Sequence, residues 1–185
     1  MRSKYALCLD PSGNYNEGKG TTGWVLMDLE TKKVIKFGVL KAAAASSQMD
    51  YWDKHIELIE GLSAYKPVVV AEDYLLYADK AEAQINSRLE TPQLLGIIQY
   101  ECWKRNIDIH MQPAVRVKTR WSEKILVHKG YLTVRGRKYL LNNHTVVGHI
   151  RDALKHGIHY ATFVYPKLKE EVLSYDQKRE GFVRT

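Results

Sequence analysis

The feature that most constrains the fold is a run of four apolar residues, Val68 to Ala71, which follows Pro67 and ends at an acid, Glu72. Successive side chains of a strand point to opposite faces, so this run is apolar on both faces. Strands of this kind are typical of the centre of a parallel sheet that helices cover on both sides. The run therefore predicts an α/β fold.

Three strands precede this run and are expected to pair as an antiparallel meander. Residues 4–10 are apolar and end at an acid, and a Gly-rich loop follows them. Residues 21–30 and 31–42 then form two further apolar segments that are separated by a turn.

The spacing of apolar residues predicts helices over 50–65 and 145–164, with another helix between them. Thr91 can cap that middle helix, with Pro92 as its first residue. A short strand at 107–111 follows it. The predicted fold is thus a five-stranded mixed sheet, in which three antiparallel strands precede a βαβαβ arrangement, flanked by helices.

Length and charge limit the possible functions. A chain of 185 residues suffices for one domain with a substantial core, expected over residues 1–165, and residues 166–185 form a charged tail. The 28 Lys and Arg residues exceed the 21 Asp and Glu residues, and a net charge of +7 favours a polyanionic partner. No apolar run approaches the roughly 20 residues that span a bilayer, so we expect a soluble cytoplasmic protein.

Three acids occupy positions that suit a metal site. Asp10 ends the first strand, Glu72 ends the fourth, and Asp152 lies in the last helix. Open α/β sheets place ligand sites at the carboxyl ends of their strands. Carboxylates brought together repel one another, and a divalent cation such as Mg²⁺ or Mn²⁺ compensates that repulsion. Each acid, taken singly, also fits an ordinary role as a turn, strand-end or solvated helix residue.

Two neighbours of these acids bear on the site. Asp73 follows Glu72, and only one of the two is expected to face the site, so Glu72 is preferred and Asp73 is the substitute. His149 precedes Asp152 by three residues and shares its helix face. This spacing suits two metal ligands, or a ligand beside a proton carrier.

A zinc site is disfavoured. His156 and His159 continue along the same side of the last helix, but no E-x-x-H pattern accompanies them. Cys8 and Cys102 have neither metal-ligand spacing nor the density of a disulfide scaffold, so both are expected to be buried apolar residues.

Several segments occur in a specific order: LCLDPSG, TTGWVLMD, VVVAE, TPQLLGIIQYECWKRNIDI, VRVKTRW and HIRDALKHGIHYA. Their order and spacing resemble the RuvC family of Holliday-junction resolvases within the ribonuclease H-like superfamily, over roughly residues 4 to 164. The resemblance implies a metal-dependent endonuclease that cuts branched DNA such as four-way junctions.

The same resemblance implies roles for individual residues. Asp10, Glu72, His149 and Asp152 would take the metal-site roles, and Lys118 resembles a family lysine near the scissile phosphate. Two Mg²⁺ ions, for which Mn²⁺ substitutes, would activate water and stabilise the leaving 3′ oxygen. A four-way junction has two symmetric strands to cut, which implies a homodimer with two active sites.

The sequence departs from the cellular resolvases in three places. The Gly-rich loop after the first acid is longer. Leu75 stands where family members carry an aromatic residue that stacks on junction bases, and Tyr74 or Tyr77 could substitute for it. An insertion at residues 131–143 is more similar to small phage-encoded relatives.

A basic stretch precedes the last helix and is expected to pair with DNA phosphates, with a solvated basic face as the alternative. Its members are Arg116, Lys118, Arg120, Lys124, Arg135, Arg137 and Lys138.

Other functions remain open at this point. The segment LDPSGNYNEGKGTTGW also resembles the first phosphate loop of the actin and sugar-kinase superfamily, whose members need two such domains to enclose ATP. A basic DNA-binding scaffold without catalysis is a non-enzymatic alternative. Among nucleases, flap, RNA:DNA hybrid and pre-ribosomal RNA substrates are alternatives, because one fold serves them all.

Overall fold

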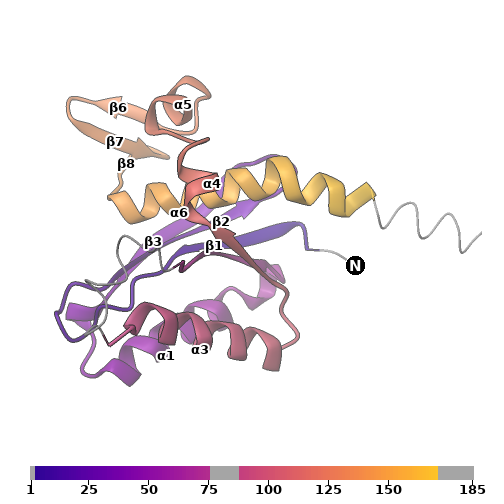
Figure 1. Cartoon of the computed structure of the whole chain (residues 1–185). Helices are drawn as coiled ribbons and strands as arrows, with labels where there is room; N and C mark the ends of the chain where they lie inside the picture. The colour runs from indigo at the N-terminus through magenta and orange to yellow at the C-terminus, as the bar shows by residue number, and fades with distance from the viewer. Residues whose placement is uncertain (1–2, 76–87, 171–185) are drawn as a thin grey trace, which may run out of the picture.

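The computed structural model describes residues 3–75 and 88–170 (Figure 1). The strands of its main sheet are β1 (Tyr5–Asp10), β2 (Thr21–Asp28), β3 (Val34–Lys41), β4 (Val68–Asp73) and β5 (Ile109–Pro113). Their order across the sheet is β3-β2-β1-β4-β5. β1, β2 and β3 pair antiparallel, whereas β4 is parallel to both β1 and β5. The predicted five-stranded mixed sheet is confirmed.

Helices cover both faces of this sheet (Figure 1). α1 (Gln48–Gly61) and α3 (Glu90–Lys104) lie on one face, and α6 (Gly148–His159) lies on the other. The shorter helical elements are η1 (Ala42–Ala44), η2 (Ser63–Tyr65), α4 (Ala114–Lys118), α5 (Glu123–His128) and the π-helical η3 (Tyr160–Val164). Helical conformation continues through residues 165–170, beyond the expected end at Val164.

The apolar run of β4 contributes to two cores, which explains why neither of its faces is polar. Val68 and Val70 pack in the core under α6, and Val69 and Ala71 pack in the core under α1 and α3. The residues of β1 alternate between the same two cores. Burial on both faces therefore places β1 and β4 at the centre of the sheet.

Two glycines let α6 approach the sheet closely. A Cβ atom at Gly157 would lie 2.8 Å from Cys8 Sγ, and one at Gly23 would lie 2.1 Å from the backbone of His149. Both distances are too short for a real contact, so these positions require glycine. The first turn of α6 thus rests directly on β2, and its last turn rests on β1. Cys8 and Cys102 are buried free thiols, as expected.

The insertion before α6 forms a second, three-stranded antiparallel sheet that the sequence patterns did not predict. Its strands are β6 (Thr133–Arg135), β7 (Lys138–Leu141) and β8 (His144–Thr145). β8 uses the residues at which the last helix was expected to begin, so α6 begins later, at Gly148.

The middle helix also begins differently from the prediction. α3 starts at Glu90, and its N-cap is Leu89 in a left-handed conformation with φ +49°. The Thr91 hydroxyl does not cap the helix, because it accepts a hydrogen bond of 2.9 Å from the backbone N–H of Gly13. In the described part of the chain, no helix is long and apolar enough to cross a bilayer.

Candidate active site

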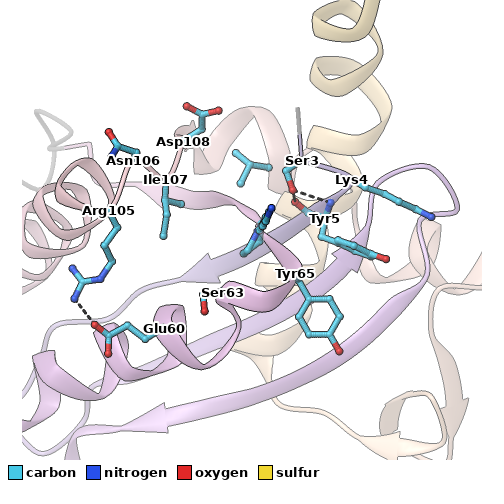
Figure 2. A pocket seen from close by; sticks show the side chains of 13 residues that line it. Ser3, Lys4, Tyr5, Glu60, Ser63, Tyr65, Arg105, Asn106, Ile107 and Asp108 are labelled. Carbon is cyan, nitrogen blue, oxygen red and sulfur yellow. Dashed lines mark hydrogen bonds and ion pairs between the residues drawn. The ribbon is translucent and has the colours of Figure 1, made fainter. Parts of the chain in front are cut away.

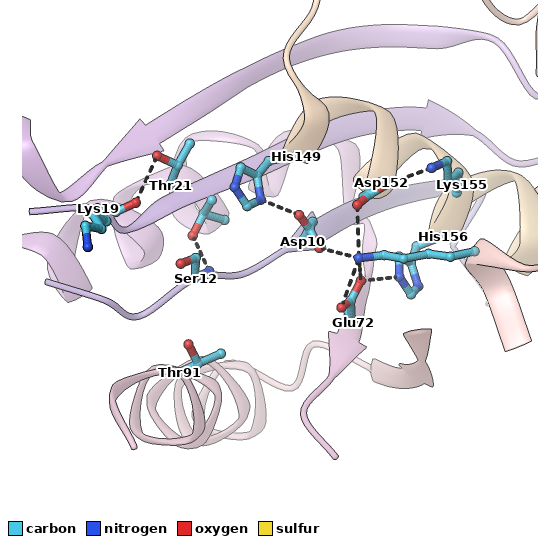
Figure 3. Close-up of polar contacts among 12 residues, drawn as sticks. Asp10, Ser12, Lys19, Thr21, Glu72, Thr91, His149, Asp152, Lys155 and His156 are labelled. Carbon is cyan, nitrogen blue, oxygen red and sulfur yellow. Dashed lines mark hydrogen bonds and ion pairs between the residues drawn. The ribbon is translucent and has the colours of Figure 1, made fainter. Parts of the chain in front are cut away.

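The acids of two neighbouring strands meet at one edge of the sheet. Asp10 is the last residue of β1, and Glu72 lies at the end of the parallel strand β4. The register pairs Leu9 with Ala71, so the two acids follow directly after a paired position. The first turns of α6 bring His149 and Asp152 to the same edge, and Figure 3 shows all four side chains gathered there.

The ammonium group of Lys118 lies among the three acids. Its Nζ atom is 2.9 Å from Glu72 Oε2, 2.9 Å from Asp152 Oδ2 and 3.6 Å from Asp10 Oδ1. Burial alone would lower the pKa of Lys118, but the charge of Asp10 and the hydrogen bonds to Glu72 and Asp152 raise it. One positive charge therefore neutralises part of the three-carboxylate cluster and reduces the repulsion among its members.

Asp10 is the most buried of these acids. Its side chain is 7 % exposed, and Oδ2 lies 2.5 Å from Nδ1 of His149. Burial raises the pKa of Asp10, although the hydrogen bond to His149 opposes this effect. The same hydrogen bond raises the pKa of His149. The pair is thus arranged to share a proton.

Glu72 is oriented by a buried histidine that sequence reasoning had set aside. The Nε2 atom of His156 lies 2.9 Å from Glu72 Oε2, and its Nδ1 atom lies 2.9 Å from Gln112 Oε1 of β5. Burial alone would raise the pKa of Glu72, but hydrogen bonds from His156 and Lys118 help to lower it to about 2. Glu72 is therefore held as a carboxylate that faces the site.

Asp152 is oriented by Lys155, another residue that sequence reasoning missed. Lys155 Nζ lies 2.7 Å from Asp152 Oδ1 and 2.8 Å from Glu123 Oε1 of α5. Only 6 % of the Lys155 side chain is exposed, so α5 and α6 enclose this pair. Lys155 and His156 follow Asp152 by three and four residues, and this helical spacing was the available signal for their proximity.

The three acids, Lys118 and His149 border a hollow of about 290 Å³. Its lining residues are Asp10, Pro11, Ser12, Glu72, Asp73, Tyr74, Thr91, Lys118, His149 and Asp152. Asp73 thus reaches the same hollow as Glu72, but the ion pairs with Lys118 involve Glu72. The hydrogen bond from the Gly13 backbone N–H to the Thr91 hydroxyl connects the Gly-rich loop to the start of α3 beside this hollow.

The other residues predicted to bind DNA lie outside this hollow. Arg116, Arg120 and Lys124 are exposed around α4 and α5, and the Arg120 guanidinium lies 4.3 Å from the centre of the Phe163 ring. Three further cations, Arg135, Arg137 and Lys138, are exposed on the small sheet. Tyr77 lies outside the described residues.

The donor set suits a hard divalent cation. Within residues 3–75 and 88–170, no three His, Cys, Asp or Glu side chains converge closely enough to hold a metal ion, and the Lys118 ammonium lies between the acids. Three carboxylate oxygens nevertheless lie within 3.6 Å of that one positive charge. Oxygen donors of this kind are the ligands that Mg²⁺ prefers.

A larger cavity of about 750 Å³ lies at the opposite edge of the sheet, beside the first residues of β1 and β4 (Figure 2). Its walls include Glu60, Tyr65 and Arg105, and Glu60 forms an ion pair with Arg105. The cavity contains none of the residues predicted to form a metal or DNA site.

The sheet order and the helices on both faces define an α/β protein with the RuvC and ribonuclease H-like fold. Two solved structures share this fold: "T. thermophilus RuvC in complex with Holliday junction substrate", with a TM-score of 0.62, and "Thermus thermophilus RuvC structure", with a TM-score of 0.59. Each is 16 % identical in sequence, and each alignment covers 88 % of this chain and 96 % of the other. No protein-family profile and no curated protein sequence matches the chain.

Proposed function

We propose that this protein is a metal-dependent, structure-selective endodeoxyribonuclease that resolves four-way DNA junctions by paired phosphodiester hydrolysis. The observation that carries the proposal is the convergence of Asp10, Glu72 and Asp152 around the Lys118 ammonium at the carboxyl edge of a RuvC-like sheet. Such a cluster of acids is unfavourable without a cation and has no evident structural role at the surface of a hollow.

The acids would hold Mg²⁺ or Mn²⁺ together with His149. Two bound ions would supply an activated water and stabilise the leaving 3′ oxygen. His149 is hydrogen-bonded to Asp10, which orients that carboxylate and places a proton carrier beside it. Because 36 % of the Lys118 side chain is exposed, its ammonium can turn from the acids to a DNA phosphate when divalent cations neutralise the cluster.

The proposed substrate is a branched DNA, because one of the proteins with this fold is described in complex with a Holliday junction. Arg116, Arg120 and Lys124 would contact phosphates next to the cut, and Tyr74, which lines the hollow, could stack on an unpaired base. Tyr77 keeps the same proposed role. A homodimer would present two such sites to the two symmetric strands.

We further propose that residues 1–165 form the nuclease domain, that residues 166–185 form a tail, and that the protein acts in the cytoplasm. A phage origin rests on the insertion before α6 alone.

The experiment that tests the function is cleavage of a synthetic four-way junction with Mg²⁺ or Mn²⁺. Wild type should be compared with Asp10→Asn and Glu72→Gln, with binding measured in parallel. Asp53→Asn is the matched control, because Asp53 is exposed on α1 and distant from the site. We expect paired symmetric nicks that both site variants lose while they still bind DNA, and that the control keeps.

Three outcomes would change the proposal. Binding without cleavage by wild type, under any divalent cation, would indicate a DNA-binding scaffold. Equal cleavage of junction, flap and RNA:DNA hybrid would keep the nuclease but remove junction resolution as its role. Cleavage that survives both substitutions would show that the acids are not the active site.

A further inference from the structure

The small sheet β6-β7-β8 projects from the main body on the side of α6 that faces away from the main sheet (Figure 1). It lies at the end of α6 that carries His149 and Asp152. Its last strand ends at Thr145, three residues before α6 begins at Gly148. The small sheet is therefore joined to the helix that supplies two residues of the proposed active site.

One face of the small sheet is attached firmly to the body of the protein. Leu141 is buried in the core under α6, and the Tyr139 ring packs against that core. The Arg151 guanidinium of α6 lies 4.9 Å from the centre of the Tyr139 ring, and the backbone N–H of Val146 donates to Tyr139 O. The Asn142 side chain donates to the backbone oxygen of Val34 in β3. These contacts fix the position of the small sheet relative to α6.

The other face points away from the core and carries only neutral and basic side chains. Because side chains alternate along a strand, Thr133 and Arg135 share a face of β6, and the register pairs them with Leu140 and Lys138. Thr145 pairs with Leu140 on the same face. A hollow of about 420 Å³ lies here, lined by Arg135, Lys138, Leu140, Asn143 and Thr145. Guanidinium, ammonium, hydroxyl and amide groups are the usual donors to DNA phosphates.

The charges of this face are not balanced. Arg135 lies directly opposite Lys138, and Arg137 is in the two-residue turn between them, where Gly136 has φ +62°. Like charges directly opposite each other destabilise a strand pair. None of these three cations forms an ion pair with a carboxylate of the described residues. An anionic partner would remove this repulsion.

We propose that the outer face of the small sheet binds the sugar-phosphate backbone of a DNA duplex, namely an arm that flanks the cut strand. The donors of this face match phosphate oxygens. β6 and β7 form a two-stranded antiparallel ribbon, an element that the major groove of duplex DNA can admit. Because the small sheet is fixed to α6, a duplex bound there is held in register with His149 and Asp152. The choice of an arm beside the cut rests on the proposed nuclease function, whereas duplex binding does not.

The experiment is to measure junction and duplex binding over a range of salt concentrations in EDTA, without cleavage. The variant Arg135→Gln/Arg137→Gln/Lys138→Gln is compared with Lys36→Gln/Lys66→Gln/Lys104→Gln, which removes the same charge from exposed positions elsewhere. We expect the slope of log K against log salt to become shallower by about 2.7 in the first variant, since roughly 0.9 is lost for each of three phosphate contacts. The control should leave the slope near that of wild type. Circular dichroism verifies that both variants are folded.

A second measurement does not depend on charge removal. Thr133→Cys, labelled with a photoactivatable aryl azide, should cross-link to a duplex arm, whereas labelled Ser63→Cys at the opposite edge should not. The native thiols of Cys8 and Cys102 are buried, so labelling is selective. The proposal would be overturned if the two triple variants gave equal slopes, or if labelled Thr133→Cys did not cross-link to DNA. It would also be overturned if a polyglutamate peptide competed for this surface as well as duplex DNA does. Cross-linking and a changed slope in a protein that cleaves no DNA would support this surface and refute the nuclease.

Discussion

The Nε2 atom of His156 lies 2.9 Å from a carboxylate oxygen of Glu72, and the imidazole is fully buried between that acid and Gln112. Glu72 of β4 is therefore held by a side chain of α6, and the ring of that side chain is held in turn by the Gln112 amide of β5. A carboxylate with a fixed hydrogen-bond partner keeps one orientation. Hydrogen-bond partners of this kind orient the ligands of metal sites.

Removal of this support should weaken the site. We expect His156→Ala to reduce junction cleavage by about 10- to 100-fold, as is typical when a partner of a metal ligand is lost. Titration calorimetry with Mn²⁺ should show weaker binding in the same variant. His128→Ala, at an exposed position of α5, is the control. Unchanged cleavage and Mn²⁺ affinity in His156→Ala would show that Glu72 needs no such support.

Lys118→Met tests whether the ammonium stands where a divalent cation would bind. The variant leaves the acids without their shared positive charge, and we expect a stability loss of about 1 kcal/mol without metal, a low value because Lys118 is partly exposed. Mg²⁺ should then raise the melting temperature of the variant more than that of wild type. An equal Mg²⁺ effect on both proteins would mean that cations do not enter this cluster.

Gly23→Ala tests the close approach of α6 to β2. The new Cβ would lie 2.1 Å from the His149 backbone, so α6 must shift, and we expect a destabilisation of about 1–3 kcal/mol together with loss of cleavage. Gly96→Ala is the matched control, because nothing lies within 4 Å of its Cβ in the middle of α3. This second substitution should stabilise the protein by about 0.5–1 kcal/mol in urea unfolding. Destabilisation of both variants alike would contradict the proposed contact.

His55 should make stability depend on pH. Burial lowers its pKa to about 4, and its ring lies 2.7 Å from Tyr51 O and 2.8 Å from Thr22 Oγ1. The unfolded chain binds a proton below its ordinary pKa of about 6.5, while the folded protein does not until about pH 4. The contribution of the neutral His55 ring to the free energy of unfolding is therefore complete above pH 6.5. It decreases by about 3 kcal/mol between pH 6.5 and pH 4.

Two measurements check this pH dependence. Urea unfolding at pH 7 and pH 4.5 should show a larger loss for wild type than for His55→Gln, which isolates this residue from other titrating groups. The NMR signals of the His55 ring should titrate near pH 4. A midpoint near 6.5 would show that the ring is accessible to protons in the folded protein.

Much of the framework followed from local patterns. The apolar run ending at Glu72 predicted a central strand, and the structure places that strand between β1 and β5. Asp10 and Glu72 could be expected at one edge because both end parallel neighbouring strands. The spacing of apolar residues and the positions at which apolar runs end are local properties of the sequence. Both can therefore be recognised without knowledge of the tertiary contacts.

The tertiary structure alone decided how the side chains of the site contact one another. The sequence left Glu72 and Asp73 as alternatives, and it predicted Lys118 near the scissile phosphate only by resemblance, not among three acids. Helical spacing put His156 on the same side of the last helix as Asp152 but did not show that its ring would hold Glu72. The small sheet was equally hidden, because its strands are two to four residues long and mostly exposed. Contacts between residues as distant as 72, 118 and 156 depend on how α4 and α6 pack against the sheet, and that packing is a long-range property that no local spacing encodes.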